Sequence, residues 1–214
     1  MCSHISPTDR TVLGTGLGLG AVPTALTLPV MLANWRMRLE QAGDNSAVTA
    51  VVTAAFEGAA VADLLEGMRG DHSWLGLSFV AEAVRSPGQV LAHVVYTRGW
   101  VDAPDRLIDV LILSPLSVRP DVQRRGLGRN LVHRSIEVLA CTRPEPVIFL
   151  EGDPEYYGRL GFRRAQQLGF TKPSVRIPDM AFQAWLLPTY TEGLTGALVY
   201  PDIFWRHDAV GLRG

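Results

Sequence analysis

Two apolar runs separated by one helical pattern constrain the fold of this chain more than any other feature. The first run, RLIDVLILSPLSV at residues 106–118, and the second, PVIFL at residues 146–150, are typical of buried strands. Between them, residues 126–140 repeat apolar side chains at helical spacing. We expect the buried side of this helix to carry Leu127, Leu131, Val138 and Leu139. A strand-helix-strand unit of this kind predicts a mixed α/β fold.

Shorter patterns on the N-terminal side of this unit extend the prediction. A strand is expected over NWRMRLE, followed by a helix that Asp44 caps and a second helix over residues 59–68. The runs LGLSFVAEAV and QVLAHVVYT flank the turn signal Ser86-Pro87-Gly88, which predicts a hairpin. On the C-terminal side, a helix is expected near Pro154, and AFQAWLLP and GALVY predict two final strands. We therefore expect hairpins at both ends of the domain.

The junction between the first apolar run and the central helix has an unusual composition. Pro115 interrupts the run, and a proline inside a strand implies an edge, a bulge or a break. The loop that follows, Gln123 to Gly128, holds two arginines and two glycines directly before the helix. Backbone N–H groups at the start of a helix bind anions, and glycine lets a ligand approach closely. An anion-binding loop and an ordinary turn with solvated arginines fit the residues of this loop equally well.

Composition limits the partners and the number of domains. The 214 residues carry a formal net charge of -1, which gives no electrostatic footprint for nucleic acid or for an anionic membrane. We expect a leader over residues 1–28, rich in Gly, Thr, Ser and Pro, and one domain over residues 29–214. The stretch Thr11 to Ala33 resembles a secretory segment, but its glycines, prolines and single Arg10 argue against that function. A G-x-G-x-x-A pattern within it, from Gly16 to Ala21, lacks the strand and helix that a dinucleotide site requires.

Cysteine and histidine give little sign of a disulfide framework or of a metal. Cys2 and Cys141 are too few and too poorly spaced for either, which favours a reducing, cytoplasmic location. No H-x-x-x-H pattern or carboxylate cluster suggests a metal. His93 lies in a strand pattern, where we expect a hydrogen-bonded core histidine.

Two blocks of sequence resemble one known family. Gln123-Arg124-Arg125-Gly126-Leu127-Gly128 resembles the Q/R-x-x-G-x-G/A signature of the GNAT superfamily of N-acetyltransferases, and Val118-Arg119-Pro120 resembles the V-x-P that commonly precedes it. The second block, GDPEYYGRLGF at residues 152–162, is similar to the end of that family's fifth strand and the helix after it. Two blocks in this order are more specific than either alone. The resemblance covers roughly Leu32 to Trp205.

The resemblance implies the GNAT fold, an α/β (α+β) fold in which a mixed, mostly antiparallel sheet has splayed parallel strands four and five and flanking helices. It also implies acetyl-CoA as the cosubstrate and no metal. By similarity, backbone groups of Leu116, Ser117 and Val118 would contact the pantetheine arm. The other residues expected at the cofactor are Gln123, Arg124, Arg125, Gly126, Leu127, Gly128 and Arg129, of which the last four would hold the pyrophosphate.

The chemistry that the resemblance implies is acetyl transfer to a primary amine of a small molecule or peptide by direct attack in a ternary complex. Tyr157 matches the family's general acid, with a packing role on a helix face as the alternative. The fourth strand lacks the glutamate that commonly serves as the base and offers only Asp109, Ser114 and Ser117. We take Glu151 as the candidate base. Asp153 and Glu82 are further candidates.

Two other functions stay open from the sequence. A non-catalytic acyl-CoA-binding regulatory module would keep the glycine motif and lack the base. A structural partner protein would use only the fold. We leave a homodimer open and expect no nucleic-acid or membrane partner. The early helices and the hairpin loops carry no motif that identifies an amine.

Overall fold

The computed structural model describes residues 34–211 of the chain. The expected leader, the G-x-G-x-x-A pattern, the whole secretory-like stretch and Cys2 lie outside the described residues. One extended sheet runs through the described part. Its strands are β1 (Trp35–Leu39), β2 (Trp74–Ala83), β3 (Val90–Asp102), β4 (Leu107–Val118), β5 (Val147–Glu151), β6 (Arg163–Arg164), β7 (Phe170–Thr171), β8 (Phe182–Leu186) and β9 (Gly196–Val199).

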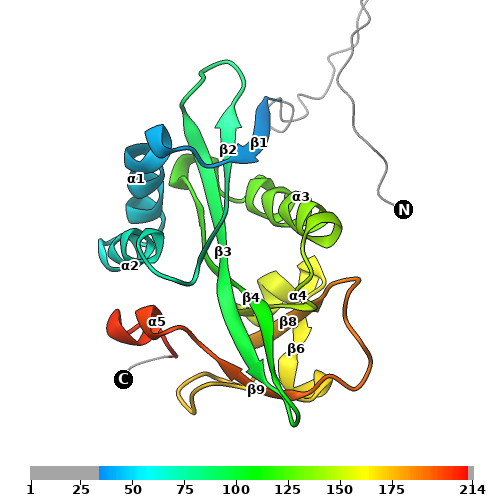
Figure 1. The fold of residues 1–214 in the computed structure, drawn as a ribbon. Helices are drawn as coiled ribbons and strands as arrows, with labels where there is room; N and C mark the ends of the chain where they lie inside the picture. Colours follow the sequence, from blue (N-terminus) through cyan, green and yellow to red (C-terminus); the bar gives the residue numbers. More distant parts are fainter. Residues whose placement is uncertain (1–33, 212–214) are drawn as a thin grey trace, which may run out of the picture. The chain divides into compact units, whose positions relative to one another are not determined.

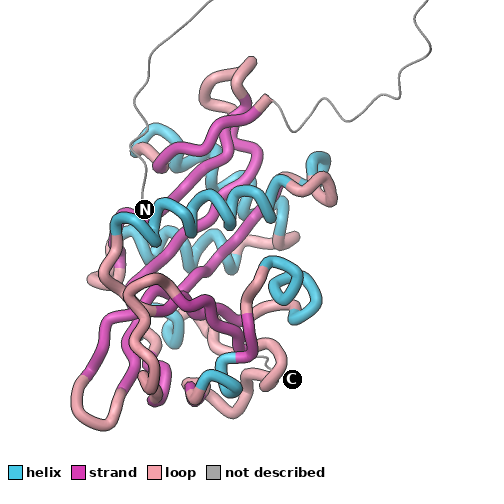
Figure 2. The backbone as a smooth tube through the Cα atoms, turned by 90° about the vertical axis from the view of Figure 1, so that its right-hand side faces the viewer, coloured by secondary structure: helices cyan, strands magenta, loops and turns pink. Residues whose placement is uncertain are grey.

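Helices cover both faces of this sheet (Figure 1). They are α1 (Asn45–Ala55), α2 (Ala60–Arg69), α3 (Leu127–Thr142), α4 (Pro154–Leu160) and α5 (Asp202–Arg206). Figure 2 shows the longest of them, α3, lying across the strands on the side opposite α1 and α2. No helix within residues 34–211 combines the length and the apolar character that a membrane crossing requires.

Alternating side chains of the strands build the separate layers of the core. In β2 and β3, Phe79 and Tyr96 pack in the cluster that contains α3, whereas Val80 and Val95 pack against α1 and α2. In β5, Ile148 faces the α3 cluster, and Phe149 belongs to the cluster that contains α5. This two-residue period is what a sheet covered on both faces requires.

The sheet order is β1-β2-β3-β4-β5-β8-β6, with β9 beside β3 and β7 beside β9. All pairs are antiparallel except β4 with β5 and β7 with β9. The mixed, mostly antiparallel sheet with one parallel β4–β5 pair confirms the predicted fold class.

Three expectations about elements were wrong. Asp44 precedes α1, but its side chain makes no capping hydrogen bond to this helix and instead accepts one from Arg38 at 2.8 Å. The final strands do not form a hairpin, because β8 pairs with β5 and β6 whereas β9 pairs with β3 and β7. Val138 of α3 is 38% exposed and is not on the buried side of the helix. The apolar face of α3 instead holds Leu127, Leu131, Val132, Ile136 and Leu139.

Candidate active site

Strands β4 and β5 separate soon after they meet. Their ladder contains only the pairs Leu111–Ile148 and Ile112–Phe149, although β4 continues to Val118. On the other edge of β4 the register against β3 shifts, so that Ser114 and Pro115 face a single residue, Val95. The break expected at Pro115 is therefore a β-bulge, which bends the strand. The two features open the sheet beside the C-terminal half of β4.

The loop after β4 presents free backbone donors at the start of α3. Arg124 has a positive φ of 58°, which is uncommon for a residue other than glycine, and Gly126 has a φ of 79° directly before the first helical residue, Leu127. Within residues 34–211, the six N–H groups from Arg124 to Arg129 form no hydrogen bond of normal geometry to a backbone carbonyl. A helix start with unpaired N–H groups and a positive dipole end binds anions.

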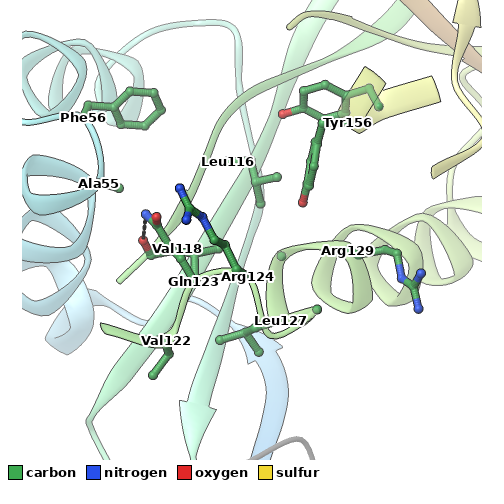
Figure 3. Close-up of a pocket in the computed structure, with 13 residues that line it drawn as sticks. Ala55, Phe56, Leu116, Val118, Val122, Gln123, Arg124, Leu127, Arg129 and Tyr156 are labelled. Carbon is green, nitrogen blue, oxygen red and sulfur yellow. Dashed lines mark hydrogen bonds between the residues drawn. The ribbon is translucent and has the colours of Figure 1, made fainter. Parts of the chain in front are cut away.

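A cavity of about 440 Å³ lies against this loop (Figure 3). The residues around it are Ala55, Phe56, Leu116, Val118, Val122, Gln123, Arg124, Gly126, Leu127, Gly128, Arg129, Tyr156 and Tyr157. Gly128 allows Tyr156 and Val118 to lie close to the start of α3. A Cβ atom on Gly128 would lie 2.9 Å from the Tyr156 hydroxyl oxygen and 3.1 Å from Val118 Cγ2. The absence of a side chain at Gly128 therefore shapes this cavity.

Most of the residues predicted at the cofactor line this first cavity, but Ser117 and Arg125 do not. Ser117 is buried at 2% exposure, and Arg125 is exposed to solvent. Gln123 has a structural contact, since its Nε2 donates to the Val118 carbonyl at 2.9 Å (Figure 3). In the same view the Arg124 side chain lies among the lining residues, whereas Arg129 points away from them.

Sequence reasoning missed four residues of this cavity. They are Ala55, Phe56, Val122 and Tyr156. Phe56 continues the apolar spacing of the first helix in the sequence, but it is 45% exposed and follows the last residue of α1. Helical spacing alone could not reveal this, because the helix ends before Phe56 and its ring turns towards the opening.

A second cavity of about 890 Å³ adjoins the first, and Phe56, Leu116 and Tyr157 line both. Its wall is mainly apolar and comes from α2, β4, the β5–α4 junction and the C-terminal segment. The ionisable side chains that line it are Glu151, Asp153, Tyr157 and Tyr200. The two cavities therefore meet at the tyrosine that was predicted to be the general acid.

Tyr157 is held at this junction by close packing. Its ring lies edge to face with Tyr156 at a centroid distance of 5.0 Å and with Phe162 at 5.6 Å. A Cβ atom on Gly152 would lie 2.3 Å from Tyr157 Cε2, so only glycine at this position leaves room for the ring. Burial, with smaller contributions from Tyr156 and Asp153, raises the pKa of the Tyr157 phenol well above its usual range. The phenol is therefore neutral at pH 7 and can donate a proton.

Glu151 ends β5 and faces the second cavity. Its Oε2 accepts a hydrogen bond of 3.0 Å from the Gly211 N–H. Burial raises the pKa of the Glu151 carboxyl, and the nearby Tyr200 hydroxyl, the Gly211 N–H and Arg176 only partly offset this effect. Its Oε1 is buried and has no hydrogen bond of normal geometry within the described residues. A buried carboxylate oxygen of this kind can accept a proton or bind a cationic group.

The other candidate carboxylates have structural contacts. Asp153 caps α4, accepting the Glu155 N–H at 2.9 Å. Glu82 lines neither cavity, and its contacts with Arg38 (3.1 Å), the Gly88 N–H (2.7 Å) and Arg36 (2.6 Å) lower its pKa to about 2. Asp109 is exposed beside Arg98. Glu151 is the only one of these carboxylates that is half-buried and lines a cavity.

Two further groups lie apart from the cavities. His93 is a fully buried core residue whose Nε2 is 2.8 Å from Ser78 Oγ, and burial lowers its pKa. Asp71, His72 and Asp202 come close enough to share an ion, but the Arg206 guanidinium already pairs with both carboxylates, at 3.1 and 3.2 Å. Because Arg206 pairs with both carboxylates, the cluster is explained as an ion-pair network.

Comparisons with known proteins agree on one family. The sequence matches no protein-family model. Over 154 residues it is 32% identical to the Escherichia coli protein "Uncharacterized N-acetyltransferase YjhQ", covering 69% of this chain and 80% of that protein. The crystal structure of the Escherichia coli GNAT family N-acetyltransferase YhbS in complex with CoA has a TM-score of 0.74 and 26% identity, covering 88% of this chain and 100% of that one.

A third similar protein shows the same fold. The GNAT family acetyltransferase from Brucella melitensis, solved in complex with acetyl-CoA, has a TM-score of 0.62 and 23% identity, covering 79% of this chain and 97% of that one. At this level of identity the likeness concerns the fold alone.

Proposed function

This chain belongs to the GNAT superfamily of N-acetyltransferases, and on that premise we propose that it transfers the acetyl group of acetyl-CoA to a primary amine of a small molecule or peptide. The observation that carries the proposal is the meeting of two cavities at Tyr157, one against a set of unpaired backbone donors and one lined by the half-buried carboxylate of Glu151. Such an arrangement suits direct attack of the amine on the thioester in a ternary complex.

The first cavity suits acetyl-CoA by its chemistry. The unpaired N–H groups from Arg124 to Arg129 would bind the pyrophosphate, and the Arg124 side chain would add a charged contact. Gly128 lets Tyr156 and Val118 lie close to the loop, where a side chain would collide with them. The backbone of β4 from Leu116 to Val118, beyond the last pair with β5, would contact the pantetheine arm. When bound, acetyl-CoA supplies the activated acetyl group.

Two proton transfers fall to residues at the junction. An alkylammonium ion with a pKa of about 10.4 must lose a proton before its nitrogen can attack. We assign this proton to Glu151, directly or through a water molecule, because its raised pKa makes it a better base than an ordinary carboxylate. As the new C–N bond forms and the C–S bond breaks, the neutral Tyr157 phenol would protonate the departing sulfur.

A second candidate function rests on the composition of β4. Its carboxylate, Asp109, is exposed and lines neither cavity, so the strand itself provides no base at the site. A regulatory module that binds acyl-CoA without turnover would have such a strand. Release of free CoA thiol in the presence of amines distinguishes the enzyme from the module.

The cofactor site is tested by thermal unfolding with CoA and with acetyl-CoA. Both should raise the melting temperature, because a ligand that binds only the folded state stabilises it. Gly126→Glu should abolish this rise, since it places a bulky anionic side chain at a positive φ beside the proposed pyrophosphate. Gly43→Glu is a matched control, because a Cβ atom there contacts nothing within 4 Å. If CoA still raises the melting temperature of a folded Gly126→Glu protein by the full amount, the loop from Arg124 to Arg129 is not the pyrophosphate site.

A further inference from the structure

We propose that the second cavity accepts a primary amine that is carried by an apolar group and bears no anionic substituent, such as an arylalkylamine. This inference rests on the proposed function, because it assigns the second cavity to the acceptor. It is carried by three features: the apolar wall, the absence of cationic side chains from the part of that wall that residues 34–211 form, and the position of Glu151.

The wall of the cavity is suited to a hydrocarbon or aromatic group. At about 890 Å³ it falls in the range of small-molecule sites. Helices α2 and α5 contribute buried apolar side chains, and loops before β8 contribute others. The apolar side chains of the wall include Val61, Leu64, Pro115, Pro178, Met180 and Phe204. Burying an apolar group here is favourable in proportion to the area that it removes from water.

No lysine, arginine or histidine is among the residues that line this cavity within the described part of the chain. The guanidinium that influences Glu151, that of Arg176, is not in the wall, and its Nε and Nη2 donate to the Val210 carbonyl at 3.1 and 2.9 Å. A carboxylate or phosphate on the acceptor would therefore lose water without gaining a cationic partner. The cavity selects against amino acids and phosphorylated amines.

The acidic groups of the wall lie at one end, where β5 joins α4. Glu151 and Asp153 flank Gly152, on whose backbone the Tyr157 ring packs. An acceptor ammonium at this end of the cavity would lie beside the Glu151 carboxylate, and its nitrogen would be close to the junction with the first cavity. The apolar group would then extend towards Val61, Leu64 and Phe204. A second cationic group on the acceptor would lie against this apolar wall and be disfavoured.

Three matched amines test this assignment on the full chain with acetyl-CoA, read by thiol release. They are 2-phenylethylamine, phenylalanine, which adds a carboxylate, and 1,4-diaminobutane, which replaces the ring by a second ammonium. We expect kcat/KM for 2-phenylethylamine to exceed that for either of the others on the order of 100-fold, as for a charge buried without a partner. A preference for phenylalanine or for the diamine overturns the inference while supporting acetyl transfer.

A charge placed in the wall should change this preference. Met180 lines the cavity and is 48% exposed, so Met180→Arg adds a guanidinium without disturbing the core. Met180→Arg should raise the ratio of kcat/KM for phenylalanine to kcat/KM for 2-phenylethylamine on the order of 10-fold. Val175→Arg is the matched control, because Val175 is 93% exposed and outside the cavity. If Met180→Arg and Val175→Arg change this substrate preference equally, the second cavity is not the acceptor site.

Calorimetry of 2-phenylethylamine with the CoA-bound protein separates the two proposals. Binding without turnover supports the apolar acceptor cavity and contradicts the catalytic function. Neither binding nor turnover, in a protein that CoA still stabilises, overturns the cavity assignment and leaves the cofactor site intact.

Discussion

The two adjacent tyrosines of α4 provide a built-in comparison. Tyr157 lines both cavities, whereas Tyr156 lines only the first. Tyr157→Phe keeps the ring that packs on Phe162 and removes the proposed proton donor. We expect kcat to fall by about 10² to 10⁴, the usual contribution of a general acid, with the Kd for acetyl-CoA nearly constant. Steady-state kinetics and calorimetry give the two quantities.

The control for this change is Tyr156→Phe, which should affect kcat much less. Equal losses in the two variants would indicate that the hydroxyls act through packing or cofactor binding. Wild-type turnover in a folded, CoA-binding Tyr157→Phe protein would mean that Tyr157 is a packing residue and that the proton reaches the sulfur by another route.

Gly152 positions Tyr157 through the space that it leaves. The Cβ atom of Gly152→Ala would lie 2.3 Å from the Tyr157 ring, which must then move. We expect a loss of kcat approaching that of Tyr157→Phe, with acetyl-CoA still bound. Gly158→Ala is the matched control, because a Cβ there meets nothing within 4 Å and alanine in a helix stabilises by about 0.5–1 kcal/mol. If both variants keep full turnover, the ring position is not critical.

The raised pKa of Glu151 predicts the pH dependence of the reaction. Glu151 accepts a proton only when it is ionised, so kcat/KM should rise with pH through a pKa above the ordinary 4.5. Glu151→Gln should lower the rate and remove this acidic limb from the pH profile. Asp153→Asn keeps a capping side chain on α4 and should leave the limb in place. If the acidic limb of the pH profile is unchanged in Glu151→Gln, another residue is the base.

At the scale of elements, an ion-pair network joins β1 to β2. The contacts of Glu82 with Arg38 and Arg36 cross this strand pair, and they lower its pKa to about 2. A carboxyl whose folded-state pKa is depressed stabilises the fold above its unfolded pKa, and this contribution disappears as the pH falls through the window from 4.5 to about 2. Glu82→Gln should therefore lower the melting temperature at pH 7 and reduce its decline between pH 5 and 3. If the melting temperatures of the wild-type protein and of Glu82→Gln decline equally between pH 5 and 3, Glu82 does not have this role.

Elements with a strong local pattern were predictable from the sequence, and pairings between distant strands were not. The apolar period of α3, the buried run of β5 and the proline bulge of β4 are local features, and the structure contains all three. The partners of β8 and β9 depend on contacts far along the chain, which no local turn signal reports. The five-residue helix α5 is too short for its periodicity to be recognised.

At the scale of the whole molecule, the second cavity combines segments that are distant in sequence. Phe56 follows α1, Leu116 is in β4, and Tyr200 and Gly211 come from the C-terminal region. The glycine loop and the tyrosine block could be located from motifs, because each is a continuous stretch. The acceptor cavity has no such stretch. Its apolar character and the burial of Glu151 emerge only when these segments pack together.

Among residues 34–211, those that line the two cavities lie between positions 55 and 211. We propose that residues 29–214 form the catalytic domain and that residues 1–28 are dispensable for binding and turnover. A chain that lacks residues 1–28 should show the same CoA-induced rise in melting temperature and the same kcat/KM as the full chain. Gly126→Glu in the shortened chain should again abolish the rise, which shows that the measured shift comes from the cradle. A lower melting temperature or a lost shift after the deletion would place part of the folded unit in residues 1–28.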